Sequence, residues 1–155
     1  MDVASRLARA LPSIGHSASP LDRVTYARDL NPRRLIELRG GKVATTQPGA
    51  IAWPTNTEEV AQLVRWASSE RVPLVPFGAG SGVCGGIAPD PRTVVVDLKK
   101  MSRVRALDES GPTLTVEAGA LGITLEEGLE RRGFTLGHFP SSILCSTVGG
   151  WIAAR

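Results

Sequence analysis

The sequence predicts an α+β protein whose first half is an α/β unit with a short parallel sheet. Apolar segments at 50–53, 72–77 and 93–98 predict three strands, and a helical pattern separates the first two. The third segment, "TVVVDL", is apolar without alternation, which is typical of a strand covered on both faces of a parallel sheet. The second half changes character, because "RVRAL" and "TLTVE" flank the turn residues "DESGP" and predict an antiparallel hairpin.

Capping and apolar patterns predict two helices. Thr55 and Glu58 fit a capping box at the start of the first helix. Its buried stripe is expected to consist of Val60, Leu63, Val64 and Ala67. The second helix follows the hairpin, with Thr124 and Glu127 as its capping box and Gly133 just after its end.

We divide the chain into an N-terminal arm, 1–48, and a domain, 49–155. The arm is expected to be partly helical, because "RRLIELRGG" predicts a helix closed by Gly40 or Gly41. The final segment, "STVGGWIAAR", begins an apolar element that stops at Arg155 without a capping residue. We therefore expect the chain to be the front piece of a longer protein, with a domain that is incomplete at its C-terminal end.

Composition and charge argue against several classes of function. The 155 residues, 42% hydrophobic and 21% charged, suit one globular domain. No apolar run approaches the roughly 18 residues of a membrane span, and the N-terminus lacks the apolar block of a secretory signal, so we expect a cytoplasmic protein. The net charge of +3 arises in residues 1–42, and only 5% of residues are aromatic, so no nucleic-acid partner is predicted.

Cys84 and Cys145 lie far apart in the sequence, and His16 and His138 are the two histidines. These four residues give no metal-ligand spacing, so no metal site is predicted. We expect both cysteines to be buried, reduced thiols.

The stretch "VPLVPFGAGSGVCGGIAPDP", 72–91, offers several interpretations. Gly80–Gly85 spells G-x-G-x-x-G, but a Rossmann turn needs a helix directly after the glycines, and the two prolines of "IAPDP" do not suit a helix interior. The acid expected about 20 residues later is also missing, because Asp97 comes too soon. No P-loop pattern is present.

This stretch contains no Lys, Arg or His, so an anion bound here would be held by main-chain amides. Glycine suits that task because it reaches positive φ and allows a close approach, and Ser81 adds a hydroxyl donor. A mobile surface loop is the alternative. Val83, Cys84 and Ile87 argue against it, because a solvated linker would not carry them.

An ordered set of motifs from about Pro48 to Arg155 resembles the FAD-linked oxidases of the vanillyl-alcohol-oxidase type. The motifs are "PLVPFGAGSGVCGG", "TVVVDLKKM" and "LTVEAGALGITLEEGLERRGFTLGHFPSSILCSTVGGW". The resemblance implies a PCMH-type FAD-binding domain, with a first α/β subdomain and the beginning of a second, mainly antiparallel subdomain. The segment "GFTLGHFPSSILCSTVGGW" is most similar to the alkylglycerone-phosphate synthase branch, although Ser141 stands where an acid often occurs.

The resemblance also implies which residues bind FAD. In the family, a first glycine loop wraps the pyrophosphate with backbone amides, and a serine-rich loop ending in S-T-V-G-G makes a second contact. Carried onto this sequence, the residues are Pro76, Phe77, Gly78, Ala79, Gly80, Ser81, Gly82, Ser141, Ser142, Ser146, Thr147, Gly149 and Gly150. The stretch 78–86 contains no histidine, so FAD is expected to be non-covalent. His138 either faces the flavin or packs within its loop.

The function implied is that of a flavin-dependent oxidoreductase acting on a small-molecule substrate, a hydroxy acid or an alcohol. Two alternatives stay open: a flavin-assisted transferase of the alkylglycerone-phosphate synthase kind, and a truncated module without catalytic turnover that retains FAD weakly or not at all. Catalytic residues of the family lie largely in a later domain, so none is named. A homo-oligomer and an electron-acceptor partner also stay open.

Overall fold

The computed structural model describes residues 1–42 and 46–154; Arg155, where the expected domain ends, lies outside the described residues. The helices are α1 (Val3–Ala10), α2 (Pro20–Thr25), α3 (Pro32–Arg39), α4 (Thr57–Glu70), α5 (Gly122–Glu130) and α6 (Val148–Ala154), with a 3₁₀ turn η1 (Ile143–Cys145). The strands are β1 (Gly15–Ser17), β2 (Ala50–Trp53), β3 (Leu74–Phe77), β4 (Val94–Asp97), β5 (Val104–Asp108) and β6 (Thr113–Val116).

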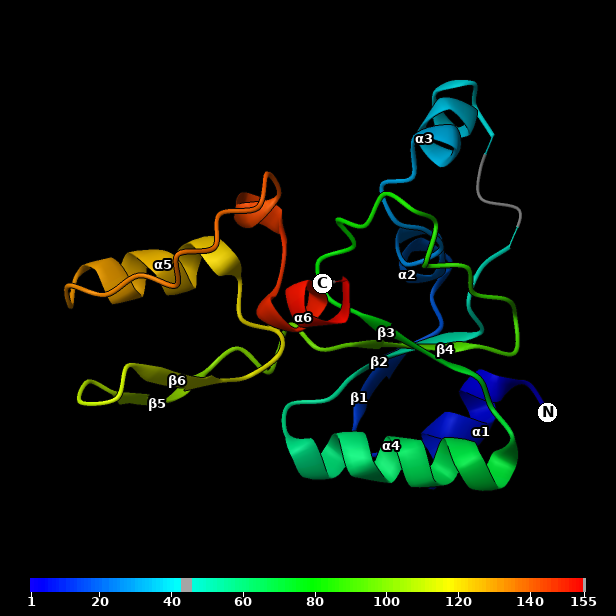
Figure 1. The fold of residues 1–155 in the computed structure, drawn as a ribbon. Helices are drawn as coiled ribbons and strands as arrows, with labels where there is room; N and C mark the ends of the chain where they lie inside the picture. The colour runs from blue at the N-terminus through cyan, green and yellow to red at the C-terminus, as the bar shows by residue number, and fades with distance from the viewer. Residues whose placement is uncertain (43–45, 155) are drawn as a thin grey trace.

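Two separate sheets confirm the α+β prediction. The first has the order β1-β2-β4-β3, in which β2, β4 and β3 are parallel and β1 is antiparallel at the edge. The second is the antiparallel hairpin of β5 and β6. Figure 1 shows the hairpin and α5 projecting side by side from the first sheet, with α6 lying close to β3. Strand β1 is only three residues long and was not predicted from the sequence.

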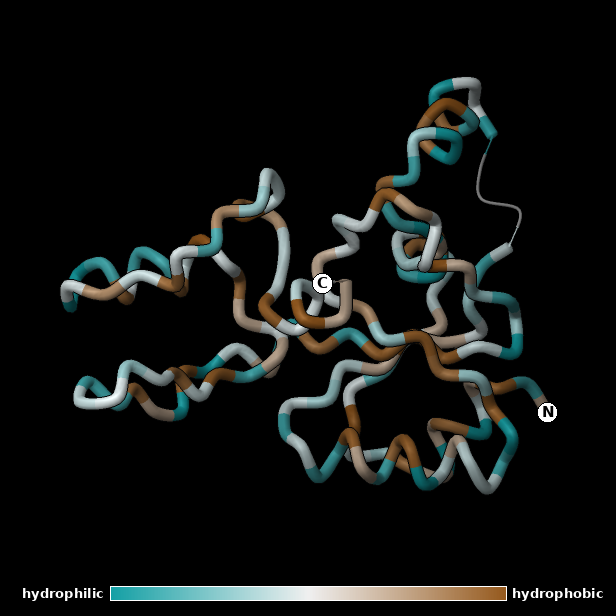
Figure 2. The backbone as a smooth tube through the Cα atoms, viewed as in Figure 1, coloured by the Kyte–Doolittle hydropathy of each residue, from teal (hydrophilic) through white to brown (hydrophobic). Residues whose placement is uncertain are grey.

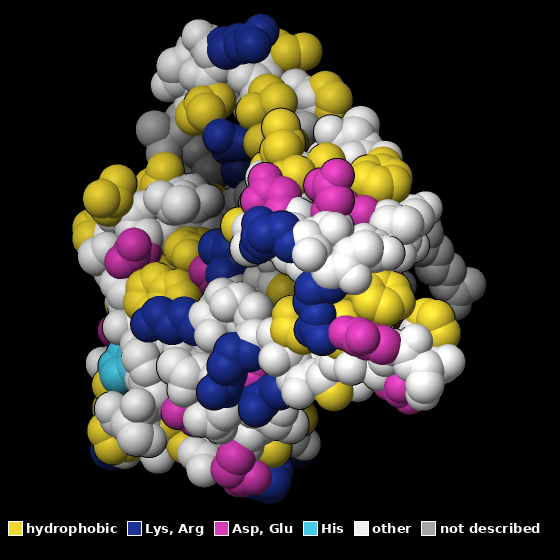
Figure 3. Space-filling view, turned by 90° about the vertical axis from the view of Figure 1, so that its left-hand side faces the viewer, with side chains coloured by type: hydrophobic (Ala, Val, Ile, Leu, Met, Phe, Trp, Pro, Cys, Tyr) yellow, Lys and Arg dark blue, Asp and Glu magenta, His cyan; other side chains and the backbone are white. Residues whose placement is uncertain are grey.

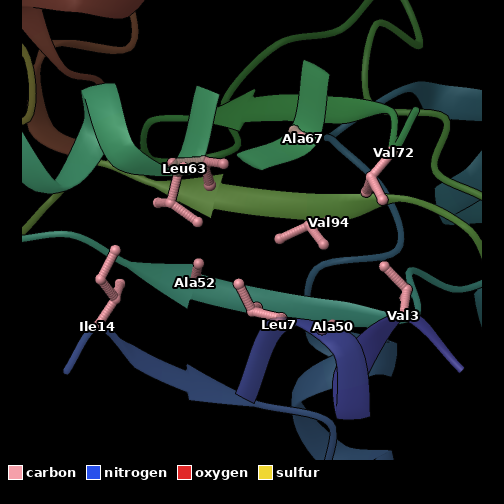
Figure 4. Packing of buried hydrophobic residues seen from close by; sticks show 10 residues of the cluster. Val3, Leu7, Ile14, Ala50, Ala52, Leu63, Ala67, Val72 and Val94 are labelled. Carbon is pink, nitrogen blue, oxygen red and sulfur yellow. The ribbon is translucent and has the colours of Figure 1, made fainter. Parts of the chain in front are cut away.

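The parallel sheet is covered on both faces, as its unbroken apolar strands predict. Ala50, Ala52 and Val94 point toward α1 and α4 and pack with Leu7, Ile14 and Leu63 (Figure 4). Val96 belongs to the same cluster. Ile51 and Val95, which alternate with them, pack on the other face with Tyr26 and Phe77. Figure 2 shows hydrophobic residues gathered along the strands at the centre of this body.

Helix α4 begins one residue later than the expected capping box. Asn56 is its N-cap and accepts a hydrogen bond from the Glu59 amide at 2.9 Å, while a Glu59 carboxylate oxygen accepts one from the Thr55 amide at 2.7 Å. The prediction of Glu58 in this role was wrong because Asn56, an equally good cap, precedes it.

The predicted stripe of α4 is also partly wrong. Leu63 and Ala67 are buried as expected, but Val64 is 53% exposed. Successive residues are turned by 100° around a helix, so Val64 lies at the side of the face that carries Leu63. Trp66 packs against the core in its place.

Helix α5 has no side-chain cap, so the capping box of Thr124 and Glu127 was wrong. The residue before the helix, Leu121, is held by an isolated antiparallel bridge to Thr147 instead. At the other end, Gly133 has a φ of +78° and the Phe134 amide donates to the Leu129 carbonyl at 3.0 Å, as expected for a glycine after a helix.

Both cysteines are free and exposed, so the prediction of buried thiols was wrong. Cys84 lies in a loop and Cys145 in the turn η1, where no packed element covers them. In the described part of the chain, no helix has the length and apolar character needed to cross a bilayer.

The face formed by the hairpin and α5 mixes charges of both signs, as Figure 3 shows. Arg103 and Arg105 both pair with Glu117, and Arg132 pairs with Glu109 at 2.6 Å. Figure 3 also shows hydrophobic side chains among the charged ones on this face, which breaks up its basic side chains.

Candidate functional site

The carboxyl ends of the three parallel strands place Trp53, Phe77 and Asp97 along one edge of the sheet. Phe77 and Asp97 are direct partners in the register of β3 and β4. In open parallel sheets, ligands bind outside this edge. The predicted first loop, 76–82, begins with the last two residues of β3, Pro76 and Phe77, and its residues 78–82 leave the sheet here.

The first loop adopts a conformation that requires glycine. Gly80 has a φ of +71°, and a β-carbon on it would lie 2.6 Å from the Phe77 ring. The chain after it, from Val83 to Pro91, is irregular and contains no helix. The literal G-x-G-x-x-G match is therefore not followed by the helix of a Rossmann turn, as the prolines predicted.

The hydrogen bonds of the first loop leave its amides available. Carbonyls at its two ends are bonded: Gly78 accepts from Lys99 Nζ at 2.9 Å, Gly82 from the Leu30 amide at 2.8 Å, and the next residue, Val83, from Asn31 Nδ2 at 3.0 Å. Across the described residues, no hydrogen bond is donated by the amides of 79–83. Main-chain amides need partners, so this side of the loop suits an anion.

The second loop is held firmly against the start of α5. Ser146 and Thr147 are buried, and the Ser146 carbonyl accepts a hydrogen bond from the Gly122 amide at 3.0 Å. The Ser146 hydroxyl accepts from Trp151 Nε1 at 2.6 Å. The Gly149 amide donates to the Ala118 carbonyl at 2.8 Å, so this amide, unlike those of the first loop, already has a partner.

The two loops meet at Gly78 and Thr147. A β-carbon on Gly78 would lie only 2.3 Å from the Thr147 hydroxyl oxygen, so glycine is required at this contact. Gly149 packs closely against Ala118, because a β-carbon added on Gly149 would lie 2.7 Å from the Ala118 β-carbon. The contact therefore brings one residue of each predicted loop, Gly78 and Thr147, together near the carboxyl ends of the parallel strands.

Not every predicted residue lies at this contact. Ser141 is exposed and precedes η1, and Ser142 uses its carbonyl to accept a hydrogen bond from the Ser146 hydroxyl at 2.7 Å. His138 is exposed, with its ring 5.0 Å from the Trp151 ring in an edge-on contact. That contact joins the loop to α6.

A buried polar network lies beside the first loop and was not predicted from the sequence. Asp97 Oδ2 accepts hydrogen bonds from Tyr26 OH at 2.5 Å and from Lys99 Nζ at 2.7 Å, and Trp53 Nε1 donates to Tyr26 OH at 3.1 Å. Burial, followed by the bond to Asp97, raises the pKa of Tyr26 to about 12, so the phenol stays protonated and donates at neutral pH. The polar end of the otherwise apolar "TVVVDLKK" was the available signal.

Two cavities of about 370 Å³ each lie among the described residues. One is an apolar groove between the hairpin and α5, lined by Leu107, Leu114, Leu125 and Leu129 among others, and Lys99 reaches its end. The other lies between α3 and the chain after Val83, and Arg33 and Arg34 line it. Neither has a residue of 78–82 in its described lining.

Residues 36–155 match the family described as an FAD binding domain. Alkyldihydroxyacetonephosphate synthase of Trypanosoma brucei brucei is 38% identical over 138 residues, which are 86% of this chain and 22% of that protein. Glycolate oxidase subunit GlcD of Bacillus subtilis (strain 168) is 30% identical over 149 residues, 96% of this chain and 30% of that protein. A solved structure of alkyldihydroxyacetonephosphate synthase has a TM-score of 0.86 at 35% identity, covering 97% of this chain and 28% of that chain. The chain spans less than a third of the length of each of these relatives.

Proposed function

This chain belongs to the FAD binding domain family, and from that premise we propose that its two glycine loops hold the diphosphate of FAD at the carboxyl edge of the parallel sheet. The observation that carries the proposal is the set of amides at 79–83, which have no donated hydrogen bond among the described residues while the neighbouring carbonyls are bonded. Such a row of free donors is suited to phosphate oxygens.

The residues present fit this group. Gly78 and Gly80 allow the first loop to pack against Thr147 and the Phe77 ring, where a β-carbon would clash, and Ser81 adds a hydroxyl donor. Thr147 brings the second loop to the first through its contact with Gly78. Lys99 adds a positive charge next to a loop that has none of its own. No histidine occurs in 78–86, which supports non-covalent binding.

When bound, FAD supplies a flavin ring whose N5 can accept a hydride from a substrate. The contribution of this chain is to bind and orient the cofactor. The proposed activity of the protein that contains this chain is oxidation of a small hydroxy acid or alcohol, which the similarity to glycolate oxidase subunit GlcD supports. The chain alone represents less than a third of such a protein and is proposed to bind FAD weakly and to have no turnover.

A specific observation favours a second candidate, a flavin-assisted transferase. The observation is the 38% identity to alkyldihydroxyacetonephosphate synthase over 86% of this chain. Anaerobic mixing of the FAD-loaded protein with 2-hydroxy acids distinguishes the two, because an oxidoreductase loses its visible flavin absorbance and a transferase retains it.

The binding proposal is tested by titrating the chain with FAD and, separately, with riboflavin, which lacks the diphosphate. We expect FAD to bind at least about tenfold more tightly, a difference of about 1.4 kcal/mol. Equal affinities for FAD and riboflavin, or no binding of FAD at millimolar concentration, contradict the proposal.

A further inference from the structure

We propose that Lys99 is a positioning residue for the first glycine loop, holding the Gly78 carbonyl so that the following amides face the anion site before any cofactor binds. The proposal rests on the function proposed above for this loop. It concerns a residue outside both glycine loops, and its evidence is a continuous set of contacts from the sheet interior to Gly78.

The ammonium group of Lys99 is fixed by two hydrogen bonds and two rings. Nζ donates to Asp97 Oδ2 at 2.7 Å and to the Gly78 carbonyl at 2.9 Å. It also lies 4.9 Å from the centre of the Phe77 ring and 5.5 Å from that of Tyr26, within the range of cation–π contacts. The Lys99 amide donates to Asp97 Oδ1 at 2.9 Å, which fixes the backbone as well.

Asp97 makes this arrangement rigid. Its side chain is only 3% exposed, so its charge requires a close counterion and hydrogen bonds. Lys99 supplies the charge, and Tyr26, itself bonded by Trp53, supplies a further donor. The network therefore connects the carboxyl ends of β2 and β4 to the first residue after β3.

These hydrogen bonds fix the direction in which the peptide groups of the first loop point. A carbonyl bound by Lys99 is turned toward the sheet, and the carbonyls of Gly82 and Val83 are bound by Leu30 and Asn31. The loop is thus held at both ends, and the amides of 79–83 donate no hydrogen bond within the described residues, which leaves them for a ligand. A loop held in its binding geometry avoids an ordering cost when the ligand arrives.

The test measures ¹⁵N relaxation of the chain without cofactor. We expect order parameters for the amides of 79–82 near about 0.85 in the unsubstituted chain, falling toward about 0.6 in Lys99→Met, which keeps the stem over the two rings and deletes the ammonium group. Lys100→Met is the matched control: Lys100 Nζ lies 5.7 Å from the centre of the Trp53 ring, and this variant should leave the loop unchanged. The amides of Val94–Val96 report whether the fold is intact.

The proposal is overturned if the loop order parameters of Lys99→Met equal those of the unsubstituted chain. It is also overturned if Lys100→Met lowers the loop order parameters as much as Lys99→Met does. If Lys99→Met does not fold, Asp97→Asn/Lys99→Met decides, because it removes the buried carboxylate charge together with its counterion and still deletes the donor to the Gly78 carbonyl. Unchanged loop order parameters in that variant also overturn the proposal. ADP titrations separate the two claims. A three- to tenfold weaker affinity in Lys99→Met is expected from lost preorganisation, whereas absence of ADP binding in every variant contradicts the FAD proposal and leaves the loop result intact.

Discussion

Gly78 and Thr147 lie so close together that a β-carbon on Gly78 would be 2.3 Å from the Thr147 hydroxyl oxygen. This contact joins the loop after β3 to the segment that enters α6, and it is the point where the two halves of the candidate site meet.

Gly78→Ala should force the two loops apart, destabilising the chain by about 1–3 kcal/mol and weakening FAD binding, because no space exists for the added methyl group. Chemical unfolding and FAD titration measure the two effects. Gly86→Ala is the control, since a β-carbon there meets nothing within 4 Å. Removing the blocking hydroxyl in Gly78→Ala/Thr147→Ala should recover part of the stability; equal stability of Gly78→Ala and Gly86→Ala contradicts the contact.

A second close approach connects the hairpin half to the sheet. A β-carbon on Gly119 would lie 1.8 Å from the Leu98 carbonyl oxygen, and that oxygen belongs to backbone that cannot turn aside as a side chain can. Gly119→Ala should therefore destabilise the chain by several kcal/mol or prevent folding. Gly128→Ala, within α5, should instead be neutral or stabilise by about 0.5–1 kcal/mol. Similar melting temperatures for the two variants refute this account of Gly119.

Alanine substitutions at two neighbouring positions of α4, Leu63 and Val64, should differ sharply in their effect on the free energy of unfolding. Leu63 is fully buried and Leu63→Ala should cost about 2–5 kcal/mol, because it leaves a cavity between α4 and the sheet. Val64 is 53% exposed, so Val64→Ala should change the free energy of unfolding by no more than about 0.5 kcal/mol. Urea unfolding of both variants decides the matter, and a comparable loss in Val64→Ala shows that the predicted stripe was right after all.

Glu117 should make the fold sensitive to acid. Hydrogen bonds from Arg103, with a further contribution from Arg105, lower its pKa from 4.5 to about 2. A carboxylate whose pKa is lower in the folded state adds stability above pH 4.5 and loses it as the pH falls toward 2. The melting temperature of Glu117→Gln should therefore fall less over this interval than that of the unsubstituted chain. Glu130→Gln, at an exposed position, serves as the control; parallel curves for all three proteins count against the two arginine contacts.

The architecture could be predicted from the sequence where a pattern is local. Continuous apolar character in "TVVV" indicated a strand buried on both sides, and the prolines after Gly86 excluded a Rossmann helix. Helix starts were less predictable, because Asn56 and Thr55 are both acceptable caps and only the packed chain selects one. Leu121 needs no side-chain cap because a distant residue, Thr147, pairs with it.

The candidate site, too, could be predicted only where its sequence pattern is local. Its glycine loops carry recognisable motifs, but the hydrogen bonds that orient the first loop come from residues far away in the sequence. Lys99 and Asn31 reach its carbonyls only because β4 and the start of α3 lie beside it in the folded chain. The exposure of Cys84 and Cys145 likewise depends on what packs over a loop, which a residue's hydrophobicity does not reveal.

The most direct measurement is an amide ¹H–¹⁵N correlation spectrum of the chain during titration with ADP, which carries the diphosphate, and with adenosine, which does not. The account predicts that ADP shifts the amides of 78–82 together with those of 146–150, and that adenosine leaves both groups in place. Shifts confined to one of these loops, or centred on the cavity beside α3, would contradict a diphosphate site shared by the two.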